Sequence, residues 1–170
     1  MEWIYRNSSD NKARFVLGIK GEKTLICFGV NPSTAEPNKL DRTMESVDRI
    51  AKNNGFDSWI MLNVYSQRAT NPNDLDSYID KDLHKRNLEE IERIMSKGTC
   101  TAWAAWGTLI KKRKYLIECL KDIDNIVEKY DCKWITIGKA SKEGHPHHPL
   151  YLRSSESIKD FSLEDYLQLF

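Results

Sequence analysis

Two short segments of the chain contain the residues best suited to chemistry. The first, residues 28–35, has the sequence FGVNPSTA, and the second, residues 144–152, has the sequence GHPHHPLYL; each follows an apolar run. Asparagine and histidine supply hydrogen bonds and proton chemistry, while glycine and proline fix the path of the backbone. In open α/β sheets, ligands bind beyond the carboxyl ends of the strands. The two segments therefore predict the walls of one pocket.

Strand-like and helix-like segments alternate along the chain, and they must position these walls. Buried strands are expected over residues 24–30, 59–64, 99–106 and 134–137. Helices are expected over residues 41–54, 80–97, 108–129 and 162–170. This alternation predicts a parallel sheet covered on both faces, preceded by a short antiparallel extension over residues 3–6 and 14–19. The predicted fold is α/β: a three-layer α/β/α domain over residues 1–170, with a short four-stranded, mainly parallel sheet and an N-terminal antiparallel β extension.

Polar residues follow each predicted core strand, and in a parallel sheet they gather at one edge. Among them are Asn31, Ser33, Asn63, Tyr65, Arg68 and Trp106, together with the histidine segment. The N-termini of three helices are expected at the same edge, where they offer backbone N–H groups to an anion. Acidic residues are few there, and the main ones are Glu36, Asp41 and Glu143. The edge suits a neutral heterocycle with a phosphate better than it suits a metal ion.

The composition is that of one ordinary globular domain. Hydrophobic residues make up 40% of the 170 residues and charged residues 30%, and 26 basic residues nearly balance 25 acidic ones. Nucleic-acid binding would therefore need a local basic patch, such as residues 111–114, although such a run is usually a solvated helix face. The chain shows no signal peptide and no membrane-spanning run, so we expect a cytoplasmic protein that binds no membrane.

The four cysteines show no C-x-x-C pair. Cys27, Cys100 and Cys132 lie in or beside apolar runs, and Cys119 lies in a predicted helix. This pattern predicts reduced thiols in a cytosolic protein.

Several motifs identify a family. The segments NPSTA, NVYSQRATNP, WG and HPLYL resemble a bacterial and phage family of unknown function, DUF1643, over nearly the whole chain. That family carries no established activity.

A more distant resemblance concerns the uracil-DNA glycosylase superfamily. Residues 29–32, GVNP, look like the Gly-x-Asn-Pro motif of its mismatch-specific branch, and Asn63 falls where fast uracil enzymes have an asparagine that reads the base edge. Trp106 begins a Trp-Gly pair, and residues 145–150 resemble the last motif, His-Pro-Ser-Pro-Leu. The resemblance implies a uracil-DNA-glycosylase-like fold and an N-glycosidic-bond hydrolase. Its partner would be a nucleobase, carried by DNA or by a nucleotide, and it would need no cofactor.

Within this resemblance, Asn31, His148 and His145 are the expected catalytic residues. Asn31 stands where the fast enzymes have an aspartate, and an amide can position a water molecule but cannot act as a base. The last motif carries an extra residue, so that His145 and His148 compete for stabilising the departing base. The expected substrate-binding residues are Pro32, Ser33, Asn63, Tyr65, Arg68, Trp106 and Tyr151.

Plainer roles stand beside these hypotheses. Asn31 and Pro32 are common in turns, Asn63 could satisfy nearby backbone, and Arg68 could form a surface ion pair. Tyr65 or Tyr151 could stack on a base or belong to the core. The close histidines lack the spacing of a zinc site. A silent nucleotide- or nucleic-acid-binding module and a small-nucleotide hydrolase are the alternative functions.

Overall fold

One mixed β-sheet forms the centre of the protein. The computed structural model describes residues 1–98 and 100–170, and within them seven strands pair in the order β1-β2-β4-β3-β5-β6-β7. The strands are β1 (Trp3–Asn7), β2 (Arg14–Ile19), β3 (Thr24–Gly29), β4 (Ser58–Asn63), β5 (Thr101–Ala104), β6 (Lys133–Ile137) and β7 (Ile158–Asp160). The middle strands β4, β3, β5 and β6 pair in parallel, whereas β1, β2 and β7 pair antiparallel at the two edges.

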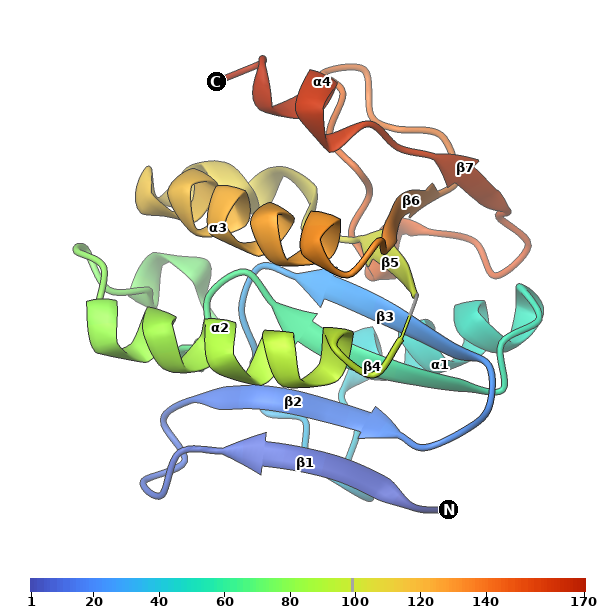
Figure 1. The fold of residues 1–170 in the computed structure, drawn as a ribbon, viewed down its shortest axis with the longest axis horizontal. Helices are drawn as coiled ribbons and strands as arrows, with labels where there is room; N and C mark the ends of the chain where they lie inside the picture. Colours follow the sequence, from blue (N-terminus) through green and yellow to red (C-terminus); the bar gives the residue numbers. More distant parts are fainter. Residues whose placement is uncertain (99) are drawn as a thin grey trace.

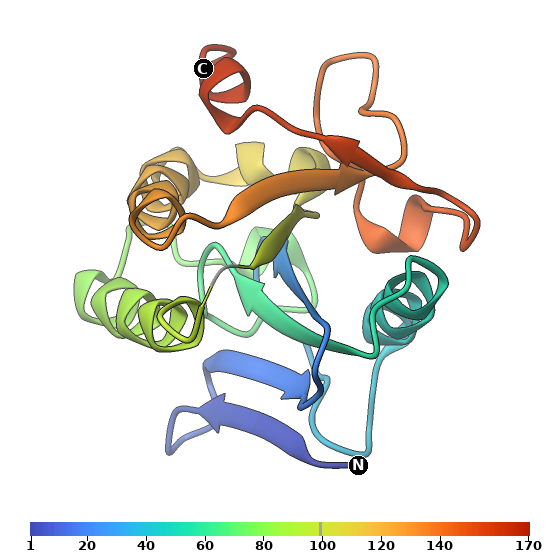
Figure 2. The ribbon, with the colours of Figure 1, turned by 45° about the vertical axis from the view of Figure 1, so that its right-hand side comes forward.

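Helices cover both faces of this sheet. They are α1 (Arg42–Asn53), α2 (Lys81–Met95), α3 (Tyr115–Lys129) and α4 (Leu163–Leu167), and η1 (Pro72–Asp74), η2 (Gly107–Lys112) and η3 (Pro149–Tyr151) are short 3-10 helices. Helices α2 and α3 lie side by side on one face (Figure 1), and α1 lies on the other face next to η3 (Figure 2). Among the described residues, no helix combines the length and apolar character that crossing a bilayer requires.

The sheet is larger than the four-stranded sheet that the sequence predicts. The N-terminal hairpin is not a separate extension, because β2 pairs directly with β4 and so continues the sheet. Strand β7 was missed because its three residues are all exposed and carry no apolar pattern. It joins the sheet through its backbone pairing with β6, and an ion pair between Lys133 and Asp160 also links the two strands.

Alternate side chains of the central strands enter two separate cores. In β3, Ile26 and Phe28 pack in the core under α2 and α3, while Leu25 and Cys27 pack in the core under α1. Successive side chains of a strand point to opposite faces, so a continuous apolar run is what a doubly covered strand requires. The two cores hold the carboxyl ends of β3 and β5 at fixed positions.

The predicted helix over residues 108–129 is wrong in its first part. Helix η2 ends at Lys112, Arg113 has extended backbone, and α3 begins two residues later. The guanidinium of Arg113 donates to the carbonyls of Asn73 and Leu75, at 3.0 and 2.8 Å. These bonds tie the segment to η1, so tertiary contacts interrupt a sequence with a continuous helical pattern.

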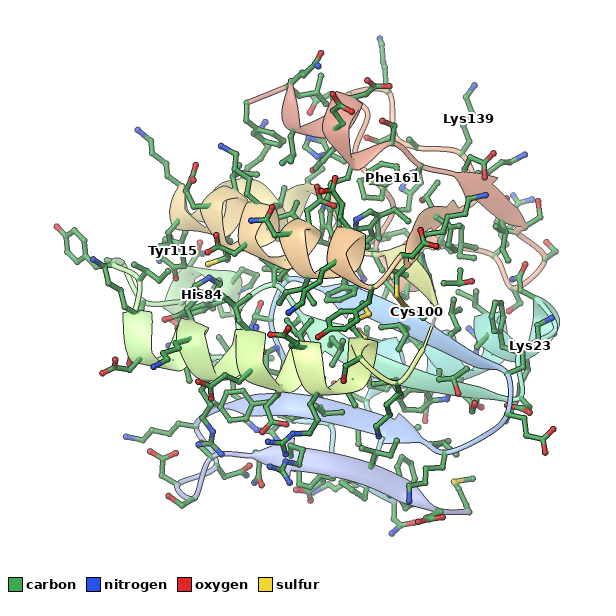
Figure 3. The ribbon with its side chains drawn as sticks, viewed as in Figure 1. Lys23, His84, Cys100, Tyr115, Lys139 and Phe161 are labelled. Carbon is green, nitrogen blue, oxygen red and sulfur yellow. A yellow bond between two sulfur atoms is a disulfide. The ribbon has the colours of Figure 1, made fainter. Side chains whose placement is uncertain are left out.

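Polar contacts also join the two helices of this face. The Nε2 atom of His84, on α2, lies 2.8 Å from a carboxylate oxygen of Asp122, on α3. Figure 3 labels His84 beside α2. The contact gives His84 a structural role, because it links α2 to α3.

The prediction that all cysteines are reduced is wrong for one pair. Cys100 and Cys132 form a disulfide, with Cα atoms 4.8 Å apart (Figure 3). They directly precede Thr101 and Lys133, which are register partners in β5 and β6, so sheet pairing brings the two sulfur atoms together. Cys27 and Cys119 are free and buried. Thr99, where the third predicted strand begins, lies outside the described residues.

Replacing Gly18 by alanine should destabilise the sheet. A Cβ atom at this position would lie 2.7 Å from the backbone oxygen of Trp59 and 2.9 Å from the Cα of Ile60. Strands β2 and β4 must separate to admit the methyl group, which should lower the free energy of unfolding by about 1–3 kcal/mol. Chemical denaturation measures this change. The exposed Lys20, changed to alanine, is the control, and a Gly18→Ala loss no larger than that of Lys20→Ala would contradict the close approach.

Candidate active site

One cavity lies at the carboxyl ends of β3 and β5. Its volume is about 630 Å³, and its walls come from the loop after β3, the first turn of α1, the Trp106–Gly107 turn and the histidine segment. Residues from both segments singled out in the sequence thus face a common space. Of the predicted site residues, the cavity is lined by Asn31, Pro32, Ser33, Trp106, His145, His148 and Tyr151.

The side chain of Asn31 is held in one orientation. Its Nδ2 atom donates to the carbonyls of Pro32 and Ala69, at 3.0 and 2.9 Å, and more weakly to that of Gln67, at 3.4 Å. Among the described residues, its Oδ1 atom has no hydrogen-bond partner. An amide fixed in this way presents its oxygen as an acceptor for water or for a ligand.

His148 is held as a neutral hydrogen-bond donor. Its Nδ1 atom accepts the backbone N–H of Leu150 at 3.3 Å, so the uncharged ring carries its proton on Nε2. Burial lowers the pKa of His148 from 6.5, while the Asp41 carboxylate acts in the opposite direction. At neutral pH this ring is uncharged, and among the described residues its Nε2 atom has no hydrogen-bond partner.

His145 has a more structural position. Trp106 donates its indole N–H to the hydroxyl of Tyr166 at 3.0 Å, and that hydroxyl lies 2.8 Å from Nδ1 of His145. The hydroxyl accepts from the indole and so joins Trp106 to His145. Burial lowers the pKa of His145, with a further contribution from Lys111, and burial raises the pKa of Tyr166 to about 12. The chain from Trp106 to His145 attaches α4 to the cavity wall.

Three predicted site residues do not line the cavity. Asn63 ends β4 and is fully buried, and Oδ1 and Nδ2 of its side chain have no partner in the described structure. A Cβ atom on its neighbour Gly29 would lie 3.1 Å from this Oδ1. Since Gly29 lines the cavity, the amide of Asn63 lies directly behind the wall.

Tyr65 and Arg68 support the surroundings of the site. The Tyr65 hydroxyl donates to Asp76 at 3.2 Å and accepts the N–H of Asp80 at 3.0 Å, and burial raises its pKa. Arg68 donates to the carbonyls of Ser33 and Ala35 and to the hydroxyl of Tyr5, so it fixes the loop after β3 from outside.

The mouth of the cavity exposes two apolar side chains. Tyr151 is 81% exposed and Leu150 is 47% exposed. The Tyr151 ring lies edge-on to His148, with 6.0 Å between ring centroids. Both side chains are therefore placed to contact a ligand at the entrance.

Sequence reasoning missed Arg14 and gave Asp41 no role, yet both line the cavity. Arg14 opens β2 and is only 2% exposed; its position before the apolar residues FVLGI was the available signal. Burial, and then the nearby Arg68, lower its pKa to about 10, while Asp41 opposes the shift. Asp41 is the N-cap of α1, where its carboxylate accepts the N–H of Met44 at 3.0 Å. Within the described residues there is no cluster of three potential metal ligands.

The central part of the chain also matches a family model, over residues 14–150. The chain belongs to the family described as protein of unknown function (DUF1643). In this DUF1643 chain the match begins at Arg14, includes Asn31 and Asp41, and extends past His148 to Leu150. No curated protein and no solved structure matches the chain.

The two lowered histidine pKa values predict how stability depends on pH. Both His145 and His148 have folded-state pKa values below 6.5, so as the pH falls through that value the unfolded chain binds protons first. The free energy of unfolding should therefore be largest above pH 6.5 and decrease below it. Denaturation between about pH 7.5 and pH 5.5 measures this loss. The His148→Gln variant should lose less stability than the parent protein over this range, and an identical slope would contradict the assignment.

Proposed function

We propose that this protein is a hydrolase of N-glycosidic bonds that releases a nucleobase, in modified or unmodified form. One observation carries the proposal: a neutral His148 donor and the oriented Asn31 acceptor line the same cavity. A departing base needs a donor for the negative charge that it develops, and the sugar carbon needs an oriented water molecule. The distant resemblance to uracil-DNA glycosylases supports the same assignment of roles.

In the proposed reaction, the bond between the sugar carbon and the base nitrogen breaks, and its electron pair leaves with the base. The Nε2–H of His148 donates a hydrogen bond to the base and stabilises this negative charge. A water molecule bound to Oδ1 of Asn31 attacks the sugar carbon. Overall, one proton of that water ends on the base, and its hydroxyl ends on the sugar.

We assign to Asp41 the negative charge that the neutral side chain of Asn31 cannot supply. Among the described residues that line the cavity, Asp41 is the one carboxylate. Its charge acts on both Arg14 and His148, and all three residues line the cavity. A carboxylate here would stabilise the positive charge that develops on the sugar as the base departs.

Asn63 is assigned the recognition of the base. Burying an amide without partners is costly, and a hydrogen bond to a donor–acceptor edge would remove that cost. Gly29 has no side chain, and the methyl group of Met61 and Oδ1 of Asn63 lie next to where its Cβ would be. A base seated against Gly29 would meet a neutral amide behind it.

The cavity mouth favours a base that is carried by nucleic acid. Exposed apolar side chains such as Leu150 and Tyr151 can contact or unstack the bases that flank an extruded nucleotide.

The alternative function, a silent binding module, is favoured by one observation: the position after β3 holds the amide of Asn31 in place of a carboxylate.

His148 should be required for base release. Oligonucleotides and nucleotides that carry uracil, hydroxymethyluracil and other modified bases form the test panel, and free base is measured by chromatography. We expect release from at least one substrate and a loss of about 100-fold in His148→Gln. The control is His84→Gln, because His84 lies on the far face between α2 and α3. A panel without any free base, measured on folded protein, would contradict the function.

Restoring an aspartate at residue 31 should not accelerate the reaction. In Asn31→Asp, an oxygen replaces the Nδ2 that donates to the carbonyls of Pro32 and Ala69, so acceptors face each other. We expect the free energy of unfolding to fall by about 1–3 kcal/mol and base release to fall with it. Denaturation and the release assay measure both, with Asn31→Ala as the comparison. Faster release by a fully stable Asn31→Asp protein would show that the amide has no positioning role.

A further inference from the structure

We infer that the cavity also binds a phosphate group, through Arg14 and the first turn of α1. The inference rests on the proposed function, because the phosphate would belong to the nucleotide whose base is released. This phosphate is the charged part of the substrate, which Asn31 and His148 do not recognise.

Arg14 is a buried cation without a matching anion. Its Nη1 atom donates to the carbonyl of Ala35 at 3.1 Å, while its Nε atom is buried and has no partner among the described residues. No carboxylate in the described part of the chain lies within ion-pair distance of it. With a pKa of about 10, the guanidinium keeps its charge at neutral pH. A buried charge of this kind is costly unless an anion binds it.

Neighbouring charges leave the region positive. Arg68 donates to the same Ala35 carbonyl, and its charge acts on Arg14. Arg42 lines the cavity at the start of α1. Asp41 is the opposing negative charge, and its carboxylate accepts a hydrogen bond from the N–H of Met44. His148 is uncharged at neutral pH and adds nothing to this balance.

The first turn of α1 supplies donors beside Arg14. The carboxylate of Asp41 accepts the N–H of Met44, and its carbonyl accepts the N–H of Glu45. The N–H groups of Arg42 and Thr43 have no acceptor among the described residues, and both residues line the cavity. A helix N-terminus of this length attracts anions through its N–H groups and its dipole.

A phosphate fits these donors better than a neutral group does. A guanidinium binds phosphate oxygens through two N–H groups, and the helix turn can donate to a third oxygen. A cavity of about 630 Å³ falls within the range that encloses ligands larger than a single base. The phosphate can come from a free nucleotide or from the DNA backbone, since the chemistry is the same.

Binding measurements test the site, and they use the His148→Gln background, in which base release is expected to be about 100-fold slower. Isothermal titration of inorganic phosphate, deoxyuridine, deoxyuridine monophosphate and a uracil-containing oligonucleotide compares the two sources of phosphate. We expect phosphate to bind, and the monophosphate or the oligonucleotide to bind more tightly than deoxyuridine. Arg14→Gln should weaken the phosphate-bearing ligands about 10-fold or more and leave deoxyuridine unchanged. Whichever ligand loses affinity in this variant identifies the source of the phosphate.

Two further comparisons keep the test decisive if Arg14→Gln does not fold. Arg42→Pro removes the first helical N–H, which α1 does not use, whereas Arg42→Ala keeps it. Phosphate should therefore bind more weakly to the proline variant than to the alanine variant. Asp41→Asn keeps the helix cap but removes the negative charge, so it should tighten phosphate binding while it slows base release.

The outcomes separate this inference from the proposed function. Arg14-dependent phosphate binding without any base release would retain the site and overturn the glycosidase. Base release without any phosphate binding would overturn the phosphate site alone. Base release would do the same if phosphate binding were unchanged in Arg14→Gln and equal in the two Arg42 variants.

Discussion

The cavity depends on the hydrogen bonds that hold the backbone between Asn31 and Ala35. Asn31 is fixed by carbonyls that include that of Ala69, while the carbonyl of Ala35 accepts from both Arg14 and Arg68. These bonds join the loop after β3 to strand β2 and to the loop after β4. A loop without regular structure is thereby held in place as one wall of the cavity.

Two buried polar side chains show a conflict between stability and binding. A folded protein rarely buries amide and guanidinium nitrogens without acceptors. Here Asn63 and Arg14 both do so, one behind the cavity wall and one at its surface. The apolar cores on both faces of the sheet compensate for this cost, which is the usual relation between a functional site and its scaffold.

The sequence predicted elements whose side chains follow a simple period. The buried run of β3 and the face of α1 that carries Met44 and Val47 were found in this way. The break at Arg113 and the edge strand β7 were missed, because bonds to distant backbone determine them. The position of most site residues followed from the strand ends. Their individual roles did not, since Tyr65 and Arg68 turn away from the cavity while Arg14 turns toward it.

The contact between Tyr166 and the cavity wall has a consequence for biosynthesis. The indole of Trp106 and the hydroxyl of Tyr166 are separated by 60 residues in the chain, and His145 joins them from a third segment. A ribosome makes the sheet strands and α1 before it makes α4. The nascent protein can therefore assemble much of its scaffold while the pocket is still unfinished, and α4, which emerges later, completes the pocket.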